Sequence, residues 1–392
     1  MKATKRLVGA TSGSVLTAFA GQGVLLISGV LAARLLGVED RGILALFALL
    51  ATAFGQVGTF GLPLAVTYFT ARNSHNEREI LRHIFPTAAL QSIAAMAIYI
   101  VLVFILSDND GENVLIAGLI TSITIPSMVI QQYALAVLQG THRFAAFNVL
   151  RLLPALVYAV ALTVVFILRV GELSEVAAGW TASNVGAAVL TLVVAVRGAS
   201  FPYGHARLPS LREMLRFGVK GFLGAASPLV TFRLDQAVVG LFLSPSALGI
   251  YVVGAAFTNL PSFVAQSIGM VAYPNVAGEP DRDIARRLMW QFFWITGAAC
   301  LALVIILETL AGWLVPLFFG QEFAEAVPIA RILLLSGLQL GVRRVLSDAA
   351  RGAGYPTLGS IAEIVACLAL LPAHGILGPL LGLEGIALAL VA

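Results

Sequence analysis

Long apolar runs alternate with short polar segments along almost the whole chain. A helix that crosses a membrane needs about 20 mostly apolar residues, and eleven runs meet or approach that requirement. They are 8–36, 43–70, 84–106, 114–138, 144–168, 176–196, 217–243, 248–276, 288–310, 326–346 and 358–371, the last extending towards Leu377. A twelfth run starts at Gly385, close to the end of the sequence, and we interpret it as a truncated helix. The pattern predicts an all-α polytopic membrane protein with about twelve transmembrane helices.

The composition supports this class and excludes a soluble protein. Hydrophobic residues make up 59% of the 392 residues and charged residues only 11%, whereas soluble domains carry about 25% charged residues. The net charge of +4 is spread over short loops without an aromatic-interleaved patch, which argues against nucleic acid as a partner. The two cysteines, Cys300 and Cys367, lie inside apolar runs without metal-ligand spacing. We therefore expect them to be small buried apolar residues, with no metal site.

The basic residues fall on alternate loops, and this alternation predicts the orientation. The first loop and every second loop after it carry 19 of the 24 Lys and Arg residues. The opposite loops carry mainly acids, among them Asp108, Glu172 and Glu325. Cytoplasmic loops of membrane proteins are enriched in Lys and Arg. We therefore expect a multi-pass protein whose N-terminus lies in the cytoplasm.

The segment 197–216 is the one long polar stretch and divides the chain almost evenly. We predict an N-terminal six-helix lobe at 1–200, a cytoplasmic linker at 201–216, and a C-terminal lobe at 217–392 with five helices and the start of a sixth. Six helices per lobe is an even number, so the two lobes would be parallel repeats around a central cavity, which is typical of transporters. Three short matches indicate a duplication: Arg78–Arg82 with Arg282–Arg286, Gly42-Ile43 with Gly249-Ile250, and Gly140 with Gly352.

Several short motifs are shared with a known family, namely Ala33–Gly37, Gly42, Gly61–Pro63, Ala65, Ala71-Arg72, Leu138–Gly140 and Leu248–Tyr251. With these motifs the sequence resembles the polysaccharide-transporter (Wzx-like) oligosaccharide flippases of the multidrug/oligosaccharidyl-lipid/polysaccharide (MOP) superfamily. The resemblance implies two lobes that rock between inward-open and outward-open states in the cytoplasmic (inner) membrane. It also implies a cargo of undecaprenyl-pyrophosphate-linked oligosaccharide, moved to the outer leaflet for surface polysaccharide, and other polysaccharide assembly proteins as partners.

Arginine side chains suit a lipid-linked diphosphate, because the planar guanidinium donates two hydrogen bonds to phosphate oxygens. Arg233 lies within the predicted helix 217–243, about 15 Å from its outer end, and it is the first candidate for a diphosphate contact. Arg34 is a second candidate, although it could equally snorkel to the interface. Asp235 is two residues further on, so on a helix its side chain would point away from Arg233. It could bind a coupling Na⁺ or H⁺, or either residue could form a structural pair with a neighbouring helix.

Uncharged amides and prolines give the remaining candidates. Gln22 and Gln56 could bind sugar hydroxyls, although most glutamines in apolar helices form interhelix hydrogen bonds. Pro63 and Pro228 could be hinges for the motion of the lobes, or static kinks. No residue is a candidate for catalysis.

Four alternative functions differ in what they require. A membrane glycosyltransferase or polymerase usually needs acidic or His groups on a sizeable external loop, and we expect only Ala311–Glu325 to form one. A cation-coupled multidrug exporter of the MATE type would carry a buried acid in the N-terminal lobe, whose acids all lie in loops. A lipid II flippase would carry an extra helix pair. A scaffold that transports nothing would leave the leaflet distribution of the cargo unchanged in a knockout.

Overall fold

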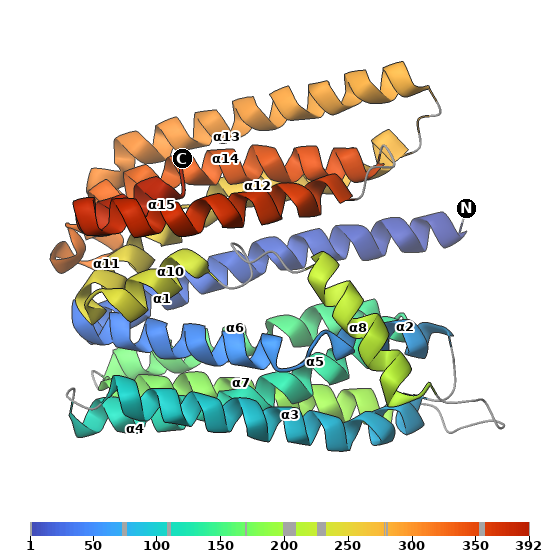
Figure 1. Cartoon of the computed structure of the whole chain (residues 1–392), viewed down its shortest axis with the longest axis horizontal. Coiled ribbons are helices and arrows are strands. Elements are labelled where there is room, and N and C mark those ends of the chain that lie inside the picture. The colour runs from blue at the N-terminus through green and yellow to red at the C-terminus, as the bar shows by residue number, and fades with distance from the viewer. Residues whose placement is uncertain are drawn as a thin grey trace. The chain divides into compact units, whose positions relative to one another are not determined.

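A computed structural model describes residues 2–72, 77–107, 111–168, 171–198, 209–225, 233–277, 279, 281–352 and 357–391, with side chains from Gly21 onward. Within these ranges every regular element is helical (Figure 1). The helices are α1 (Lys2–Val57), α2 (Leu62–Arg72), α3 (Glu77–Leu106), α4 (Glu112–Ser122), α5 (Thr124–Gly140), α6 (Phe144–Leu168), α7 (Leu173–Arg197), α8 (Leu211–Ala225), α10 (Leu234–Phe242), α11 (Pro245–Ala256), α12 (Asn259–Ala277), α13 (Arg282–Phe319), the 3₁₀ turn η1 (Gln321–Phe323), α14 (Ala326–Gly352) and α15 (Thr357–Ala389).

The multi-pass helical class predicted from the apolar runs is confirmed. Nine spans in the described part of the chain are long and apolar enough to cross a membrane. Two of them contain a change of direction, because α1 has a non-helical residue at Gly37 (φ 70°) and α15 has one at Gly382 (φ 60°). Only glycine adopts such backbone angles without strain. The total of about twelve transmembrane helices stays a prediction.

The chain forms two compact units. The first unit consists of residues 1–35 and 47–226, and the second unit consists of residues 36–46 and 227–392. The short segment Leu36–Leu46 therefore packs with helices that are distant from it in sequence. Residues 217–225 belong to the first unit, whereas the alternating pattern assigned them to the C-terminal lobe. The predicted lobe limits themselves stay a prediction.

In the first unit, α2, α3, α5 and α8 surround a shared apolar core. Leu62, Ile84 and Met214 are each at most 1% exposed within it. The rings of Tyr68 on α2 and Phe217 on α8 stack with centroids 4.5 Å apart. The helix α7 completes the unit by packing against α4, α5 and α6. Burial of the apolar face of α8 in this way ties the segment after the linker to the first unit.

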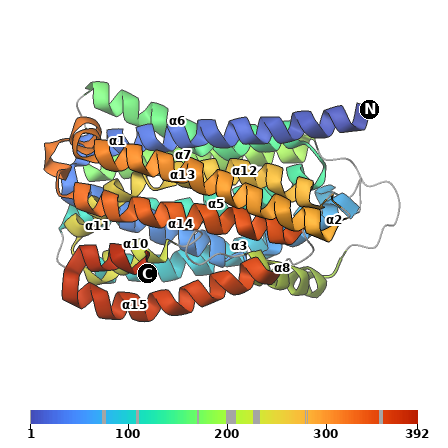
Figure 2. The same cartoon turned by 90° about the horizontal axis from the view of Figure 1, so that it is seen from above.

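In the second unit, α14 occupies the centre and packs against α11, α12, α13 and α15. Figure 2 shows α12, α13 and α14 running side by side. Cys300 on α13 is buried among Ala265, Ala272 and Val345, and its Sγ lies 3.5 Å from the carbonyl oxygen of Pro261. The expectation of a buried apolar cysteine is confirmed for Cys300, whereas Cys367 is only half-buried.

Several runs predicted as single helices are interrupted. Run 43–70 divides at residues 58–61, where Phe60 and Gly61 have left-handed backbone angles (φ 48° and 71°). Run 248–276 divides between α11 and α12, and run 114–138 divides at Ile123 between α4 and α5. Run 217–243 is helical over 211–225 and 234–242, with residues 226–232 outside the described part of the chain. A continuous apolar run does not reveal such breaks, because hydropathy does not depend on backbone angles.

Pro63 has a different position from the one predicted, because it lies in the first turn of α2 rather than inside a helix. Backbone N–H groups of a first turn have no intrahelical partner, so proline removes no hydrogen bond there. Pro261 has the same place in the first turn of α12, and each proline follows a leucine. The broken second helix of each predicted lobe therefore has the same construction. This correspondence supports the predicted duplication.

A second prediction to correct is the external loop Ala311–Glu325. The helix α13 continues to Phe319, and η1 follows directly. Ala311, Val315 and Phe319 are buried along one face of this part of α13. The described chain therefore has little irregular structure in this region that could support an extracellular catalytic loop.

Two glycines that the sequence matched as repeats of each other lie in contact. A Cβ atom at Gly42 would overlap the backbone carbonyl of Pro245, and one at Gly249 would overlap the carbonyl of Val38. The segment Leu36–Leu46 therefore crosses α11 with the two backbones touching, which only glycine permits. Both glycines belong to the second unit.

Candidate functional site

The second unit buries a charged residue at the start of a short helix. Asp235 lies in the first turn of α10 and is 6% exposed. The hydroxyl of Tyr251, on α11, donates a hydrogen bond of 3.0 Å to Oδ2 of Asp235, and Tyr251 is fully buried. A carboxylate inside a membrane protein is costly and usually faces a partner or a functional cavity. Its position at a helix N-terminus lowers this cost, because the helix dipole favours negative charge there.

His374 lies close to this pair and was not a candidate in the sequence. It belongs to α15, is 5% exposed, and lies near the carboxylate of Asp235. Neither ring nitrogen makes a well-formed hydrogen bond with the described residues, although the backbone of Ile386 lies beside the ring. Asp235, Tyr251 and His374 thus come from α10, α11 and α15. We call these three residues the buried acid cluster.

Arg233 stands directly before α10 with left-handed backbone angles (φ 45°, ψ 56°). Such angles cost a non-glycine residue about 1–3 kcal/mol. The prediction of a helix interior at Arg233 is therefore wrong, and the angle that helical geometry would place between Arg233 and Asp235 does not apply. The half-buried guanidinium lies close enough to Tyr251 to act on its hydroxyl electrostatically. The structure thus brings Arg233 to the buried acid cluster.

The other predicted site residues lie elsewhere. Arg34 is exposed on α1, and Gln22 and Gln56 are half-buried on the same helix. All three belong to the first unit, whereas Arg233 and Asp235 belong to the second. Pro228 lies outside the described residues. Among the predicted site residues that the structure describes, only Arg233 and Asp235 lie beside the buried acid cluster or within it.

Two amides of the first unit, Gln91 and Gln132, have structural partners. Nε2 of Gln91 donates to the carbonyl of Thr59 (3.3 Å), and its Oε1 accepts from the hydroxyl of Tyr133 (2.6 Å). Nε2 of Gln132 donates to the carbonyl of Gly55 (3.2 Å). Both bonds reach carbonyls near the break between α1 and α2. The carbonyl of Thr59 also accepts from the N–H of Leu62 (3.0 Å), so Gln91 is its second partner. They support the interpretation that most glutamines in the apolar runs connect helices.

No group of three or more His, Cys, Asp or Glu side chains in the described ranges has an arrangement that could hold a metal ion. The buried acid cluster offers one carboxylate, one imidazole and one phenol. This set can bind a proton or a single small cation and can change its charge by one. It has no nucleophile with an adjacent base, which covalent catalysis would require.

Comparisons with known proteins were made for the whole chain. The family model described as "Polysaccharide biosynthesis protein" matches residues 30–328, more than half of the chain. A putative O-antigen transporter from Shigella flexneri is 21% identical over 374 residues, which cover 88% of this chain and 86% of that protein.

Solved structures with the same fold are transporters. The lipid II flippase MurJ in an inward closed conformation has a TM-score of 0.76 at 14% identity, covering 96% of this chain and 84% of that one. An inward-facing multidrug resistance MATE transporter of the MOP superfamily has a TM-score of 0.66 at 16% identity, covering 94% and 90%. These likenesses establish a MOP-type fold. With the family and the O-antigen relative, they identify a membrane transporter and not an enzyme.

Proposed function

The chain belongs to the polysaccharide biosynthesis protein family, and we propose that it is a flippase for undecaprenyl-pyrophosphate-linked oligosaccharide. The protein moves this cargo across the cytoplasmic membrane, with its N-terminus in the cytoplasm, by alternating access of its two lobes. Its partners are the lipids of the membrane around it and other polysaccharide assembly proteins, which deliver or receive the cargo. Membership of the family and the whole-length similarity to a putative O-antigen transporter support this proposal.

One observation carries the proposal, namely the buried acid cluster with Arg233 beside it. A charge at the centre of a membrane helix costs about 2.5–3.5 kcal/mol in insertion experiments, and Arg233 adds backbone strain. A purely structural role would be served by uncharged residues at lower cost. Arg233 is therefore assigned to the diphosphate of the cargo, which it can grip with two parallel hydrogen bonds.

The other candidates complete the proposed site. Arg34 provides a second contact for the diphosphate, and Gln22 and Gln56 bind sugar hydroxyls as donors and acceptors. Asp235 binds the coupling ion, Na⁺ or H⁺. The carboxylate of Asp235 also accepts the hydrogen bond of Tyr251. Binding of a cation at this carboxylate would reduce the negative charge near Arg233 and so change how strongly Arg233 binds phosphate. Differential binding of this kind is what shifts a transporter between two states.

The breaks near prolines serve as bend points in this proposal. The break at residues 58–61 lies directly before Pro63, and Pro228 lies in the segment outside the described residues. A bend at such a place changes few hydrogen bonds, because the helix is already interrupted.

The test uses Arg233→Ala and Arg233→Lys in cells that depend on this protein for surface polysaccharide. We expect normal protein level, loss of polymer, and accumulation of the lipid-linked unit on the cytoplasmic side. Lys restores transport only partly, because it lacks the planar fork. The matched control is Arg331→Ala, since Arg331 lies at a helix end and pairs with Glu308 at 3.8 Å. Normal export by both Arg233 variants would refute the assignment of Arg233 to the cargo.

The same cells separate the alternative functions. Accumulation of lipid II with cell lysis would indicate a lipid II flippase, which is the activity stated for the MurJ structure. A change in drug sensitivity without a change in polymer would indicate a multidrug exporter, as stated for the MATE structure. An unchanged leaflet distribution after deletion would indicate a scaffold.

A further inference from the structure

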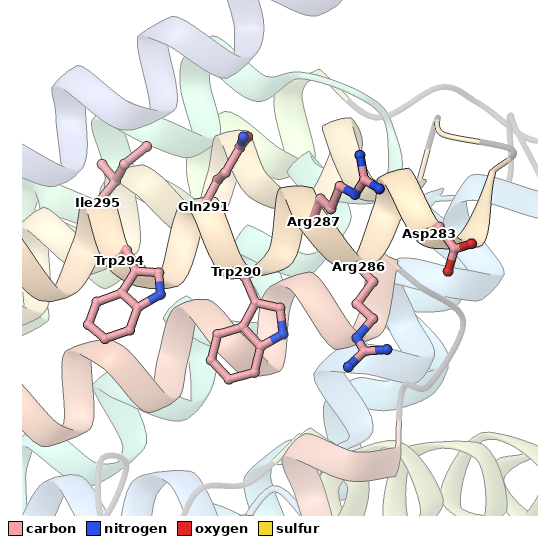
Figure 3. Close-up of a pocket in the computed structure, with 7 residues that line it drawn as sticks. All are labelled: Asp283, Arg286, Arg287, Trp290, Gln291, Trp294 and Ile295. Atoms are coloured by element: carbon pink, nitrogen blue, oxygen red, sulfur yellow. The ribbon is translucent and has the colours of Figure 1, made fainter.

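The first part of α13 lines an open pocket of about 950 Å³ that has no part in the proposed transport site. Figure 3 shows Arg286, Trp290 and Trp294 pointing towards one side of the helix, while Arg287 and Gln291 point to the other. The remaining lining residues are Asp283 and Ile295. Side chains at spacings of four residues share a helix face. The pocket thus combines two guanidinium groups with two indole rings.

The side chains of this pocket are available for a ligand. Trp290 is 50% exposed and Trp294 is 68% exposed. Neither Arg286 nor Arg287 forms an ion pair or hydrogen bond with any residue that the structure describes. Two arginines with one acid, Asp283, leave a net charge of +1 at the rim. An exposed apolar and basic surface without internal partners indicates an interaction site.

The order of these residues along α13 matches one layer of a bilayer. The helix begins at Arg282, and Arg286 lies eight residues before Trp294, or about 12 Å along the axis. Half of the hydrocarbon core is about 15 Å thick. With the start of α13 at the membrane surface, this spacing would put the arginines at the headgroup level and the tryptophans among the first chain carbons. Exposed apolar residues continue the same helix towards the membrane centre at Leu301 and Ile305.

This order selects the chemistry of the ligand. A free phosphate would contact the arginines but would leave the two indoles unused. A sugar attached to a lipid phosphate would extend towards water, away from the tryptophans. A phosphate followed inward by hydrocarbon contacts all of these residues. The net charge of +1 matches a single negative charge better than the diphosphate of the proposed cargo.

We propose that this pocket binds a monoanionic glycerophospholipid of the leaflet that faces the start of α13. Arg286 binds its phosphate, and Trp290 and Trp294, on the same side of the helix, pack against the upper part of its acyl chains. Arg287, which lines the pocket from the other side of the helix, adds positive charge at the rim. The charge pattern of the sequence predicts that this leaflet is cytoplasmic. The inference does not depend on the proposed cargo or on Arg233.

The test uses the fluorescence of the protein's own tryptophans. The chain has four tryptophans, so W180F/W313F keeps the two in the pocket, and W180F/W290F/W294F keeps only Trp313. Trp313 is a matched control, since it lies on the same helix and is 63% exposed. Each protein is placed in neutral vesicles that contain a small fraction of phosphatidylglycerol or phosphatidylcholine brominated near the headgroup end of its chains.

We expect brominated phosphatidylglycerol to quench the pocket tryptophans more strongly than brominated phosphatidylcholine does. One net charge at an interface corresponds to about fivefold enrichment of the anionic lipid. Trp313 should respond equally to both lipids. Adding R286Q/R287Q to W180F/W313F should remove the preference, while adding R282Q should preserve it, because Arg282 is exposed but outside the pocket.

Three results would overturn the proposal. Equal quenching of the pocket tryptophans by both lipids would show that no anionic lipid is selected. Equal loss of preference with R282Q would show a general surface charge instead of a built site. Undecaprenyl diphosphate displacing brominated phosphatidylglycerol at equimolar amounts would show that the pocket prefers the diphosphate. The stability of the variants is followed by their thermal unfolding in the same neutral vesicles.

Discussion

The two units solve the same physical problem in different ways. Both place polar groups inside an apolar, membrane-spanning structure, where an unpaired group is costly. In the first unit the neutral side chains of Gln91, Gln132 and Tyr133 connect helices through hydrogen bonds of 2.6–3.3 Å. In the second unit the ionisable residues Asp235 and His374 are buried near each other, and Arg233 lies close to Tyr251. Neutral pairs fix a structure, whereas ionisable groups can also change charge, so the comparison predicts a supporting role for the first set and a transport role for the second.

The largest effect is expected from Asp235→Asn. The amide keeps a hydrogen-bond acceptor for Tyr251, so the fold should be unaffected, but the site can no longer bind a cation by charge. A coupling between two sites is typically worth about 5–150-fold, and we expect transport to fall on the order of 100-fold. The measurement is export of the lipid-linked unit at matched protein level. Full transport by this variant would show that the charge at Asp235 is not used.

The reverse pattern is expected for Gln91→Leu in the first unit. The substitution leaves the hydroxyl of Tyr133 without its partner, at a cost of about 1–3 kcal/mol in unfolding free energy, whereas the carbonyl of Thr59 keeps the N–H of Leu62. Transport per folded molecule should be unchanged. The control is Gln139→Leu, because Gln139 is exposed on α5. A loss of transport without a loss of thermal stability would assign a functional role to the first-unit network.

Two tyrosines sharpen the comparison further. Tyr99 bonds Thr121 at 2.7 Å in the first unit, and Tyr251 bonds Asp235 at 3.0 Å in the second. Tyr251→Phe removes one buried hydrogen bond, and Tyr99→Phe removes two, because the hydroxyl of Tyr99 also donates to the carbonyl of Phe47 (3.3 Å). Each lost bond should cost about 1 kcal/mol in stability. Only Tyr251→Phe should also reduce transport, by about fivefold. Similar transport rates in the two variants, each divided by its folded fraction, would contradict the contrast between the units.

The smallest effect concerns the break between α1 and α2. Gly61 has left-handed backbone angles, so Gly61→Ala should cost about 1–2 kcal/mol. Pro63→Ala should change stability by less than about 0.5 kcal/mol, because the N–H of a first turn has no helical partner. Thermal unfolding of both variants decides whether glycine or proline maintains the break. A larger loss of stability for Pro63→Ala than for Gly61→Ala would show that the proline is the main cause of the break between α1 and α2.

The sequence predicted the class of the fold well, because long apolar runs have few alternatives in water. It did not predict the breaks at Ile123 or at Phe257–Thr258, since neither place carries a glycine or proline at the break itself. Arg233 and Asp235 were found because charge within an apolar run is rare. Tyr251 and His374 were missed, because tertiary packing alone brings α11 and α15 to Asp235. The common face of Trp290 and Arg286 was likewise not recognised, since their spacing is informative only once α13 is known to start at Arg282.

The segment Leu36–Leu46 has a consequence for the evolution and engineering of this architecture. Its eleven residues lie between two segments of the first unit in the sequence but complete the second unit through the crossing of Gly42 and Gly249. The second unit is therefore not a continuous stretch of sequence. A C-terminal fragment that starts at the linker would lack residues 36–46 and so contain an incomplete second unit. Chimaeras that exchange whole lobes between relatives would pack residues 36–46 of one protein against α11 of another. The exchange should therefore succeed only where residues 36–46 and the C-terminal half come from the same protein.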